Sequence, residues 1–221
     1  MPLVELHDES AGYNGRAILH GLSLKIENGE RIALVGESGA GKSTLLRLIY
    51  ERVGNAAALV PQELGLVQAL TVFHNVYMGR LNERSVWRNL RNLLMPRGPD
   101  VAEVQVVVER MRLDDKLFAN VGELSGGQQQ RTAVGRALYH SGDMLIGDEP
   151  VSAVDEHQAR DILEVVNTEK RSVVLAMHDR ALAISFADRL IGIKDGRIVL
   201  DESSSGMKPS DLDHLYLNGV E

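Results

Sequence analysis

Short apolar runs along the chain alternate with longer segments in which apolar residues recur every three or four positions. Arg31–Val35 and Ser172–Met177 are nearly continuous apolar runs, which is typical of strands buried on both faces of a parallel sheet. Leu190–Ile193 and Arg197–Leu200 flank Asp195-Gly196, a dipeptide that favours a tight hairpin turn. Further strand candidates are Leu3–Leu6, Leu22–Ile26, Ala56–Val60 and Asp143–Gly147.

The helical segments fall between these strands. Periodicity predicts a helix from about Lys42 to Glu51, which Gly54 can end, and another from about Glu156 to Val166. Residues 64–124 are mostly helical in pattern, with a break at residues 96–99, where two prolines flank an arginine and a glycine. A short helical stretch is expected from Pro209 to Tyr216. The basic residues of the helical region are Arg80, Arg84, Arg88 and Arg91.

Strands that alternate with helices predict an α/β fold built on a parallel sheet, with ligands bound at the carboxyl ends of its strands. The length of 221 residues suits one domain with an insertion. We therefore expect a single domain over residues 1–221, in which residues 64–124 form an inserted helical subdomain.

Charge and composition disfavour some classes of partner and exclude some kinds of site. The net charge of −7 disfavours nucleic acid as a partner, because such proteins usually present a basic face. The chain has no cysteine, which excludes disulfides and thiolate metal sites. No run approaches ~18 consecutive apolar residues, so a role at a membrane would require other chains to span it.

A phosphate-binding motif follows the strand at residues 31–35. Residues 36–43 read Gly-Glu-Ser-Gly-Ala-Gly-Lys-Ser, which is the P-loop pattern between a strand and a helix. Its glycines let backbone N–H groups turn toward phosphate oxygens, and the helix N-terminus adds positive potential. Lys42 supplies a point charge for the β and γ phosphates, and the Ser43 hydroxyl is a candidate Mg²⁺ ligand. The nucleotide-binding residues expected here are Gly36, Ser38, Gly39, Ala40, Gly41, Lys42, Ser43 and Thr44.

Two adjacent carboxylates, Asp148 and Glu149, end the apolar run that begins at Met144. A turn of the backbone at a strand end can present both side chains to one site. Asp148 fits a Mg²⁺ ligand, and Glu149 fits the base that polarises an attacking water. A P-loop followed by an acid pair predicts a nucleotide hydrolase, without deciding which one.

The segment Leu124–Arg131 contains a second glycine-rich helix start, with Ser125 as a natural N-cap. A second anion-binding surface in a chain that already has one makes sense if it serves the nucleotide of another copy. The segment resembles the signature motif of ABC-type ATPases, the energy-coupling subunits of ABC transporters. That resemblance implies a P-loop fold with a mostly parallel sheet, a small antiparallel β subdomain and an inserted helical subdomain.

The resemblance implies further site residues. Tyr13 corresponds to the aromatic residue that stacks on adenine, Gln62 to the glutamine that senses Mg²⁺ and the membrane partner, and His178 to the switch histidine at the γ-phosphate. Residues 152–155 are similar to the loop that crosses the dimer interface. ATP and Mg²⁺ would then lie between two head-to-tail subunits, with Ser125, Gly127 and Gln128 acting from the second one.

The implied assembly is a homodimer, or a pseudo-dimer with a paralogue, beneath transmembrane permease subunits at the cytoplasmic face of the membrane. A solute-binding protein would take part indirectly. Segments around Trp87 and at residues 211–216 are similar to ATPases of phosphonate importers, which favours phosphonate or a related phosphorus oxyanion as the solute. Only twenty positions separate Lys42 from Gln62, a shorter connection than is typical of the family, so part of the antiparallel subdomain is expected to be missing.

Three alternatives remain open. An ABC exporter of the lipid or lipoprotein type would carry much the same signature helix, although the Trp87 region favours import. A soluble ABC-type ATPase acting on DNA or the ribosome usually needs coiled coils or two fused ATPase domains, and this chain shows neither. A degenerate subunit that does not hydrolyse ATP is disfavoured because Lys42, Asp148, Glu149 and His178 are all present.

Overall fold

The computed structural model describes residues 2–13 and 16–216. It divides into two compact units. Unit 1 comprises Met1–Ala57, Ile146–Glu149 and Arg171–Glu221, and unit 2 comprises Ala58–Leu145 and Pro150–Lys170.

Unit 1 is built on a mixed, mostly parallel sheet. The central strand β3 (Arg31–Val35) pairs in parallel with β6 (Ser172–Ala176) on one side and β7 (Arg189–Lys194) on the other. β7 pairs antiparallel with β8 (Arg197–Ser203), while the end of β5 (Met144–Asp148) adjoins β6. All five residues of β5 and of β6 are buried, which is why both segments read as continuous apolar runs.

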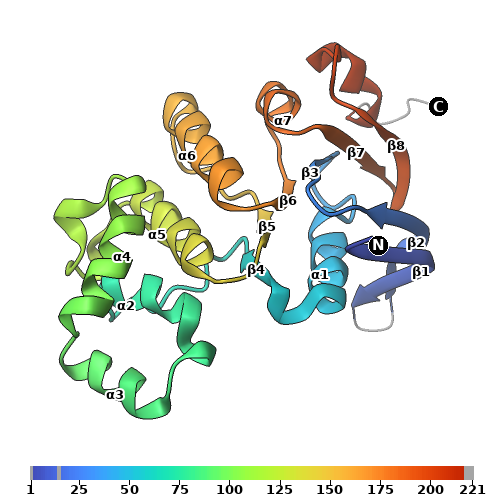
Figure 1. Ribbon diagram of the computed structural model, residues 1–221. Coiled ribbons are helices and arrows are strands. Elements are labelled where there is room, and N and C mark those ends of the chain that lie inside the picture. The colour runs from blue at the N-terminus through green and yellow to red at the C-terminus, as the bar shows by residue number, and fades with distance from the viewer. Residues whose placement is uncertain (1, 14–15, 217–221) are drawn as a thin grey trace. The chain divides into compact units, whose positions relative to one another are not determined.

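A separate antiparallel pair, β1 (Val4–Tyr13) and β2 (Arg16–Ile26), forms the small second sheet of unit 1. Both strands are longer than the sequence predicted, because their outer parts carry polar residues on exposed positions. Figure 1 shows α1 (Lys42–Val53) lying beside this pair, and its residues Leu45, Leu46 and Ile49 are buried. The predicted parallel sheet and small antiparallel sheet are thus both present.

The predicted turns and helix ends of unit 1 follow from local chemistry. Gly54 is the C-cap of α1, and its φ of 60° is a backbone conformation that favours glycine. Asp195 and Gly196 have φ values of 50° and 70°, the backbone that a tight β7–β8 hairpin requires. The unit also contains η1 (Gly54–Ala56), α7 (Arg180–Phe186) and η5 (Pro209–Leu215), and η5 replaces the predicted helix at residues 209–216 by a 3₁₀ segment.

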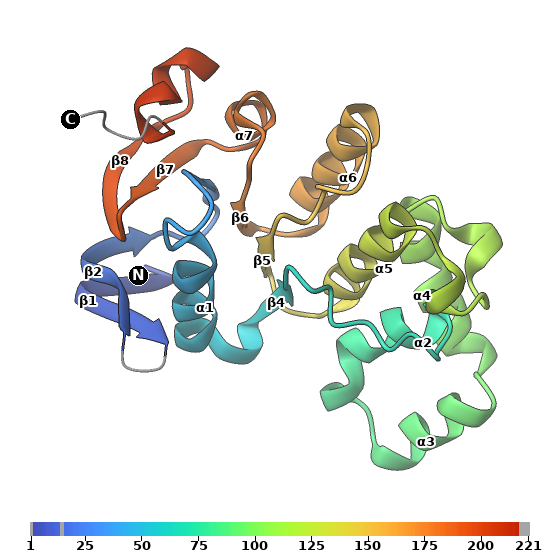
Figure 2. The same cartoon turned by 180° about the vertical axis from the view of Figure 1, so that it is seen from behind.

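Unit 2 is mainly helical and contains the whole of the predicted insertion, residues 64–124. Figure 2 shows α2 (Val72–Tyr77), α4 (Gly98–Arg110) and α5 (Gly126–Tyr139) packed together. α3 (Val86–Leu94) ends just before the predicted break, and Pro99 lies in the first turn of α4. The remaining elements are β4 (Ala57–Val60), which adjoins β5, η2 (Met78–Glu83), η3 (Asp114–Lys116), η4 (Val121–Glu123) and α6 (Glu156–Glu169).

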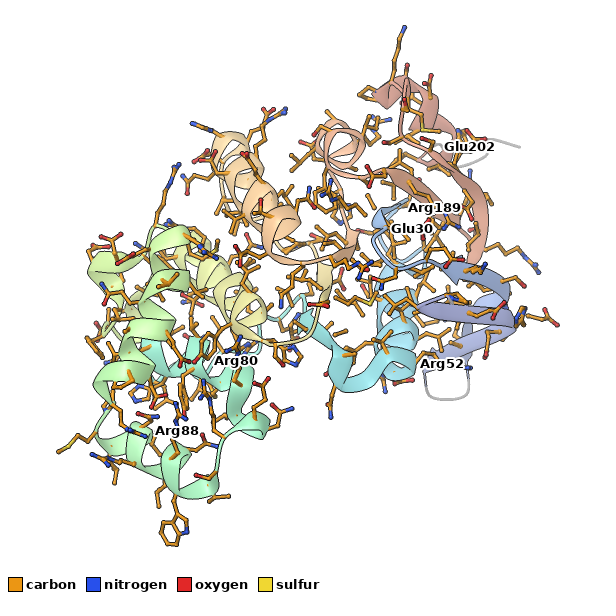
Figure 3. The ribbon with its side chains drawn as sticks, viewed as in Figure 1. Glu30, Arg52, Arg80, Arg88, Arg189 and Glu202 are labelled. Atoms are coloured by element: carbon orange, nitrogen blue, oxygen red, sulfur yellow. The ribbon has the colours of Figure 1, made fainter. Side chains whose placement is uncertain are left out.

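Three arginines of the helical region form ion pairs or hydrogen bonds within unit 2. Arg88 pairs with the fully buried Asp100, and Arg84 Nη2 lies 2.6 Å from a carboxylate oxygen of Glu103. Burial alone would raise the pKa of Asp100, but its hydrogen bonds with Arg88 and Asn92 hold that pKa below the ordinary value. Figure 3 labels Arg80 and Arg88, and Arg80 Nε donates to the Tyr139 carbonyl oxygen at 2.6 Å. These three arginines therefore tie helices together rather than form a basic face.

Candidate functional site

The P-loop of unit 1 runs from β3 to α1, as the sequence predicted. Gly36 has a φ of 142°, and a Cβ there would lie 2.2 Å from the Ile193 carbonyl oxygen, so only glycine fits. Gly39 has a φ of 83° with open space beside its Cα. α1 begins at Lys42, and its N-cap, Gly41, supplies no side-chain cap, which leaves the first N–H groups of the helix to an anion. Ser38, Gly39 and Ser43 are exposed, whereas Ala40, Gly41, Lys42 and Thr44 are buried.

Lys42 lies at the centre of this loop. Its Nζ donates to the carbonyl oxygens of Gly36 and Glu37 at 2.7 and 2.9 Å. Burial lowers the pKa of Lys42, and the charges of Glu149 and Asp148 oppose that shift. The P-loop lysine follows β3 and the acid pair ends β5, two strands of the same sheet.

The acid pair lies at the end of β5. Asp148 is the last residue of the strand and is buried, while Glu149 has a left-handed backbone with a φ of 53°. Such a conformation is strained for a residue with a Cβ, and strain of this kind concentrates at functional sites. Glu149 N donates to the Ala176 carbonyl oxygen at 3.1 Å, which anchors the turn to the end of β6.

His178 follows β6 by two residues and meets this turn. Its Nε2 lies 2.5 Å from Glu149 Oε1. The sequence predicted both residues for one site, and the structure brings them into direct contact. His178 is partly exposed, so the pair remains accessible to a substrate.

The residues near the P-loop include oxygen donors of the kind that binds Mg²⁺. Across residues 2–13 and 16–216, no three His, Cys, Asp or Glu side chains cluster in a way that could hold a metal ion. Mg²⁺ is usually bound by one or two protein oxygens together with phosphates and water. The Ser43 hydroxyl and the Asp148 carboxylate, both in unit 1, are oxygen donors of that kind.

Gln62 belongs to unit 2, where it is exposed on the loop after β4. The loop continues through Leu64 and Gly65, which have φ values of 49° and 57°. Arg136 of α5 donates to both of their carbonyl oxygens, at 2.5 and 2.6 Å. Burial lowers the pKa of Arg136. Sequence reasoning missed this residue, because an arginine inside a helix does not reveal which loop it reaches.

The start of α5 is organised as the sequence predicted. Ser125 caps the helix: its Oγ accepts from Gln128 N at 3.4 Å, and Gln128 Oε1 accepts from Ser125 N at 3.0 Å. A Cβ on Gly127 would lie 2.9 Å from the Ala153 carbonyl oxygen, so residues 152–155 pack closely on this helix start. Gln130 strengthens that contact, since its Oε1 accepts from Ala153 N at 2.8 Å.

Tyr13, the predicted adenine partner, ends β1 opposite Arg16, and its side chain lies outside the described part of the chain. The other predicted residues divide between the units. Unit 1 holds the P-loop, Asp148, Glu149 and His178, and unit 2 holds Gln62, Ser125, Gly127 and Gln128.

Comparison with known proteins gives a consistent picture. A family model described as ABC transporter matches residues 19–152. The phosphonates import ATP-binding protein PhnC 1 of Pseudomonas syringae pv. tomato is 35% identical over 234 residues, covering 93% of this chain and 88% of that protein. The PhnC protein of Pseudomonas putida is 34% identical over 244 residues, covering 97% and 90%. The chain spans about half the length (48%) of a 33% identical PhnC relative from Anaeromyxobacter dehalogenans.

Solved structures agree on the fold. A nucleotide-free ATP-binding cassette from an ABC transporter superposes with a TM-score of 0.78 at 20% identity, covering 99% of this chain and 100% of that one. A dimeric bacterial ABC transporter cassette gives 0.78 at 24% identity, covering 92% and 99%. With the family model and the relatives above, these likenesses lead to one conclusion: the chain belongs to the ABC transporter family, as an ATP-binding cassette.

Proposed function

We propose that the chain binds and hydrolyses ATP as the energy-coupling subunit of an ABC importer for phosphonate or a related phosphorus oxyanion. The observation that carries the ATPase proposal is geometric: the P-loop with Lys42 follows β3, the acid pair ends β5, and His178 follows β6 and contacts Glu149. It places a phosphate-binding cation and two carboxylates at one edge of the sheet, where nucleotides bind in folds of this class.

Binding would use the uncapped start of α1. Backbone N–H groups of residues 41–44 at the helix start would point at the phosphates, and Lys42 would exchange the carbonyl oxygens of Gly36 and Glu37 for phosphate oxygens. Tyr13 would stack on the adenine ring. Ser43, Asp148 and Gln62 would hold Mg²⁺, which neutralises charge on the phosphates when it is bound.

Hydrolysis would depend on the contact between Glu149 and His178. Glu149 would accept hydrogen bonds from the attacking water and orient it toward the γ-phosphate. His178 would fix the rotamer of Glu149 and donate to a γ-phosphate oxygen. This division of work suits phosphoryl transfer, in which the protein mainly positions groups and stabilises charge.

The second half of the site would come from another copy. Ser125, Gly127 and Gln128 would face the ATP of the partner in a head-to-tail dimer, either a homodimer or a pseudo-dimer with a paralogue. In the cap, Ser125 Oγ serves as an acceptor, so its O–H proton is left to donate to a phosphate. The dimeric cassette among the similar folds supports this arrangement.

Membrane coupling would use unit 2. Among the helices that the structure describes, none is long and apolar enough to cross a bilayer. An apolar groove of 340 Å³ lies between α2, η2 and α3, and we assign it to a helix of the permease subunit. Its lining includes Leu70, Tyr77, Leu81, Val86, Leu90 and Leu93. The chain would thus act at the cytoplasmic face of the membrane, and a solute-binding protein on the other side would deliver the solute.

Co-purification tests the proposal. A tagged Glu149→Gln variant is extracted from native membranes in mild detergent with ATP, and the proteins that accompany it are identified. A polytopic membrane protein in stoichiometric amount supports the transporter subunit, and a solute-binding protein that binds methylphosphonate more tightly than sulfate supports the solute class. A soluble dimer without membrane partners, or ribosomes or nucleic acid instead, contradicts the transporter role while leaving the ATPase chemistry standing.

A further inference from the structure

Tyr216, at the end of η5, contacts the first residue of the P-loop. Its hydroxyl oxygen accepts a hydrogen bond from Gly36 N at 3.2 Å across 180 positions of sequence. The segment that carries Tyr216 is anchored in unit 1, because Leu212 and Leu215 of η5 are fully buried. Burial raises the pKa of Tyr216, so the phenol is a neutral acceptor at neutral pH.

Gly36 is therefore held through both of its backbone polar groups. Its N–H is held by Tyr216, and its carbonyl oxygen accepts from Lys42 Nζ at 2.7 Å. A Cβ on Gly36 would lie 2.2 Å from the Ile193 carbonyl oxygen, so this position packs closely on β7. One of the two hydrogen bonds of Lys42 Nζ therefore ends on the residue that the Tyr216 hydroxyl contacts.

The same tyrosine also contacts the element that follows His178. The guanidinium of Arg180 lies 5.0 Å from the centroid of the Tyr216 ring, a cation–π geometry. Arg180 also donates to the Pro209 carbonyl oxygen at 3.3 Å and pairs with Asp213. Arg180 is the first residue of α7, two positions after His178, so these contacts tie η5 and Tyr216 to the start of that helix.

We propose that Tyr216 and Arg180 are positioning residues for the ATPase site, linking the start of the P-loop to the histidine that contacts Glu149. This inference rests on the proposed function, because it assigns roles to residues of that site. The C-terminal segment is then part of the nucleotide site's support. A change at Tyr216 should alter nucleotide affinity, and a change at Arg180 should alter turnover.

The test begins with Tyr216→Phe, which keeps the ring against Arg180 and removes only the oxygen that Gly36 uses. One neutral hydrogen bond corresponds to a factor of about 3 to 10 in binding. We expect the dissociation constant for a fluorescent ATP analogue with Mg²⁺ to rise by that factor, with kcat within about twofold of wild type. The amide of Gly36 should exchange with solvent faster in the variant, as measured by NMR on ¹⁵N-labelled protein.

Arg180→Met provides the second arm, since it keeps the side-chain stem and removes the guanidinium. We expect kcat to fall by about fivefold or more with a smaller change in nucleotide affinity, because α7 and His178 lose their anchor. Tyr139→Phe is the matched control: it removes a hydroxyl that donates to Glu103 in unit 2 and should leave nucleotide affinity unchanged.

Wild-type affinity together with wild-type Gly36 exchange in Tyr216→Phe would overturn the inference, as would an equal effect of Tyr139→Phe. Wild-type protein that fails to bind the analogue would instead contradict the proposed function. Amide exchange at Gly36 is measured without nucleotide. It therefore tests the hydrogen bond to Tyr216 whether or not the protein binds the analogue. If Tyr216→Phe does not fold, Arg180→Met provides the test. A lower kcat with little change in nucleotide affinity supports the inference, and wild-type kcat contradicts it.

Discussion

Glu149 Oε1 and His178 Nε2 lie 2.5 Å apart, and the residues approach each other from the ends of neighbouring strands. The contact exists because Glu149 adopts a left-handed backbone immediately after β5 and His178 follows β6. This contact holds the Glu149 carboxylate in the position that a catalytic base would need, so the role of Glu149 can be tested by substitution.

Glu149→Gln should bind ATP but hydrolyse it about 100-fold more slowly or worse, because an amide cannot serve as a general base. Without turnover the ATP-bound dimer should accumulate, which size-exclusion chromatography with Mg²⁺ and ATP will detect. Glu51→Gln, in an exposed pair with Arg47 on α1, is the control and should behave like wild type. Wild-type turnover in Glu149→Gln would remove Glu149 from the catalytic role.

Mixing two inactive variants should restore activity if the site is shared between subunits. Lys42→Ala removes the P-loop cation, and Ser125→Arg blocks the opposing helix start. In a mixed dimer, one composite site can carry both lesions and leave the other intact. ATPase activity should therefore recover partly on mixing and be lowest for each variant alone. Absence of recovery at every mixing ratio would count against a shared site.

Arg136→Lys should loosen the loop that carries Gln62. A lysine ammonium cannot reproduce the forked contact with the carbonyl oxygens of Leu64 and Gly65. Hydrogen exchange at residues 62–66 should accelerate and kcat should fall several-fold, with nucleotide affinity little changed.

Arg131→Lys is a matched control for this experiment. Arg131 lies on the same helix and donates to two consecutive carbonyl oxygens, those of Met111 and Arg112, at 3.0 and 3.1 Å. This control should cost stability without affecting exchange at residues 62–66. Equal exchange in both variants would show that Arg136 has no particular role in the loop.

Lys170 predicts a pH dependence of stability. Its Nζ is buried and donates to the carbonyl oxygens of His140 and Gly142 at 2.5 and 2.7 Å. Burial, with a contribution from Arg80, lowers its pKa from 10.5 to about 8. Between these values the unfolded chain holds more protons than the folded one, so this group makes the free energy of unfolding rise with pH.

Lys170 should raise the free energy of unfolding by about 3 kcal/mol in total between pH 8 and 10.5. Below pH 7 it should not contribute to the pH dependence of that free energy. Urea unfolding of wild type and Lys170→Met at pH 7.5, 9 and 10 measures it, with the surface variant Lys116→Met as a control. As the pH increases, the free energy of unfolding of wild type should rise relative to that of Lys170→Met. Parallel pH profiles would mean that Lys170 titrates normally.

Much of the fold could be predicted because its signals are local. The apolar runs at residues 31–35 and 172–177 became β3 and β6, Gly54 ended α1, and Asp195-Gly196 formed the hairpin turn. The lengths of β1 and β2 were underestimated, since their exposed polar positions weaken the strand signal. Arg80, Arg84 and Arg88 are close together in sequence, but each also contacts a group on another helix: the Tyr139 carbonyl oxygen, Glu103 and Asp100.

What the sequence determined by itself is the set of chemical groups and their immediate backbone. Glycines placed between a strand and a helix make a phosphate-binding loop, and Ser125 with Gln128 makes a capping box, because both depend on a few neighbouring residues. Tertiary structure alone decided which distant groups support them: Tyr216 on Gly36 and Arg136 on Leu64, 180 and 72 positions apart. The physical reason is that such contacts depend on strand order and helix packing, which no local periodicity encodes.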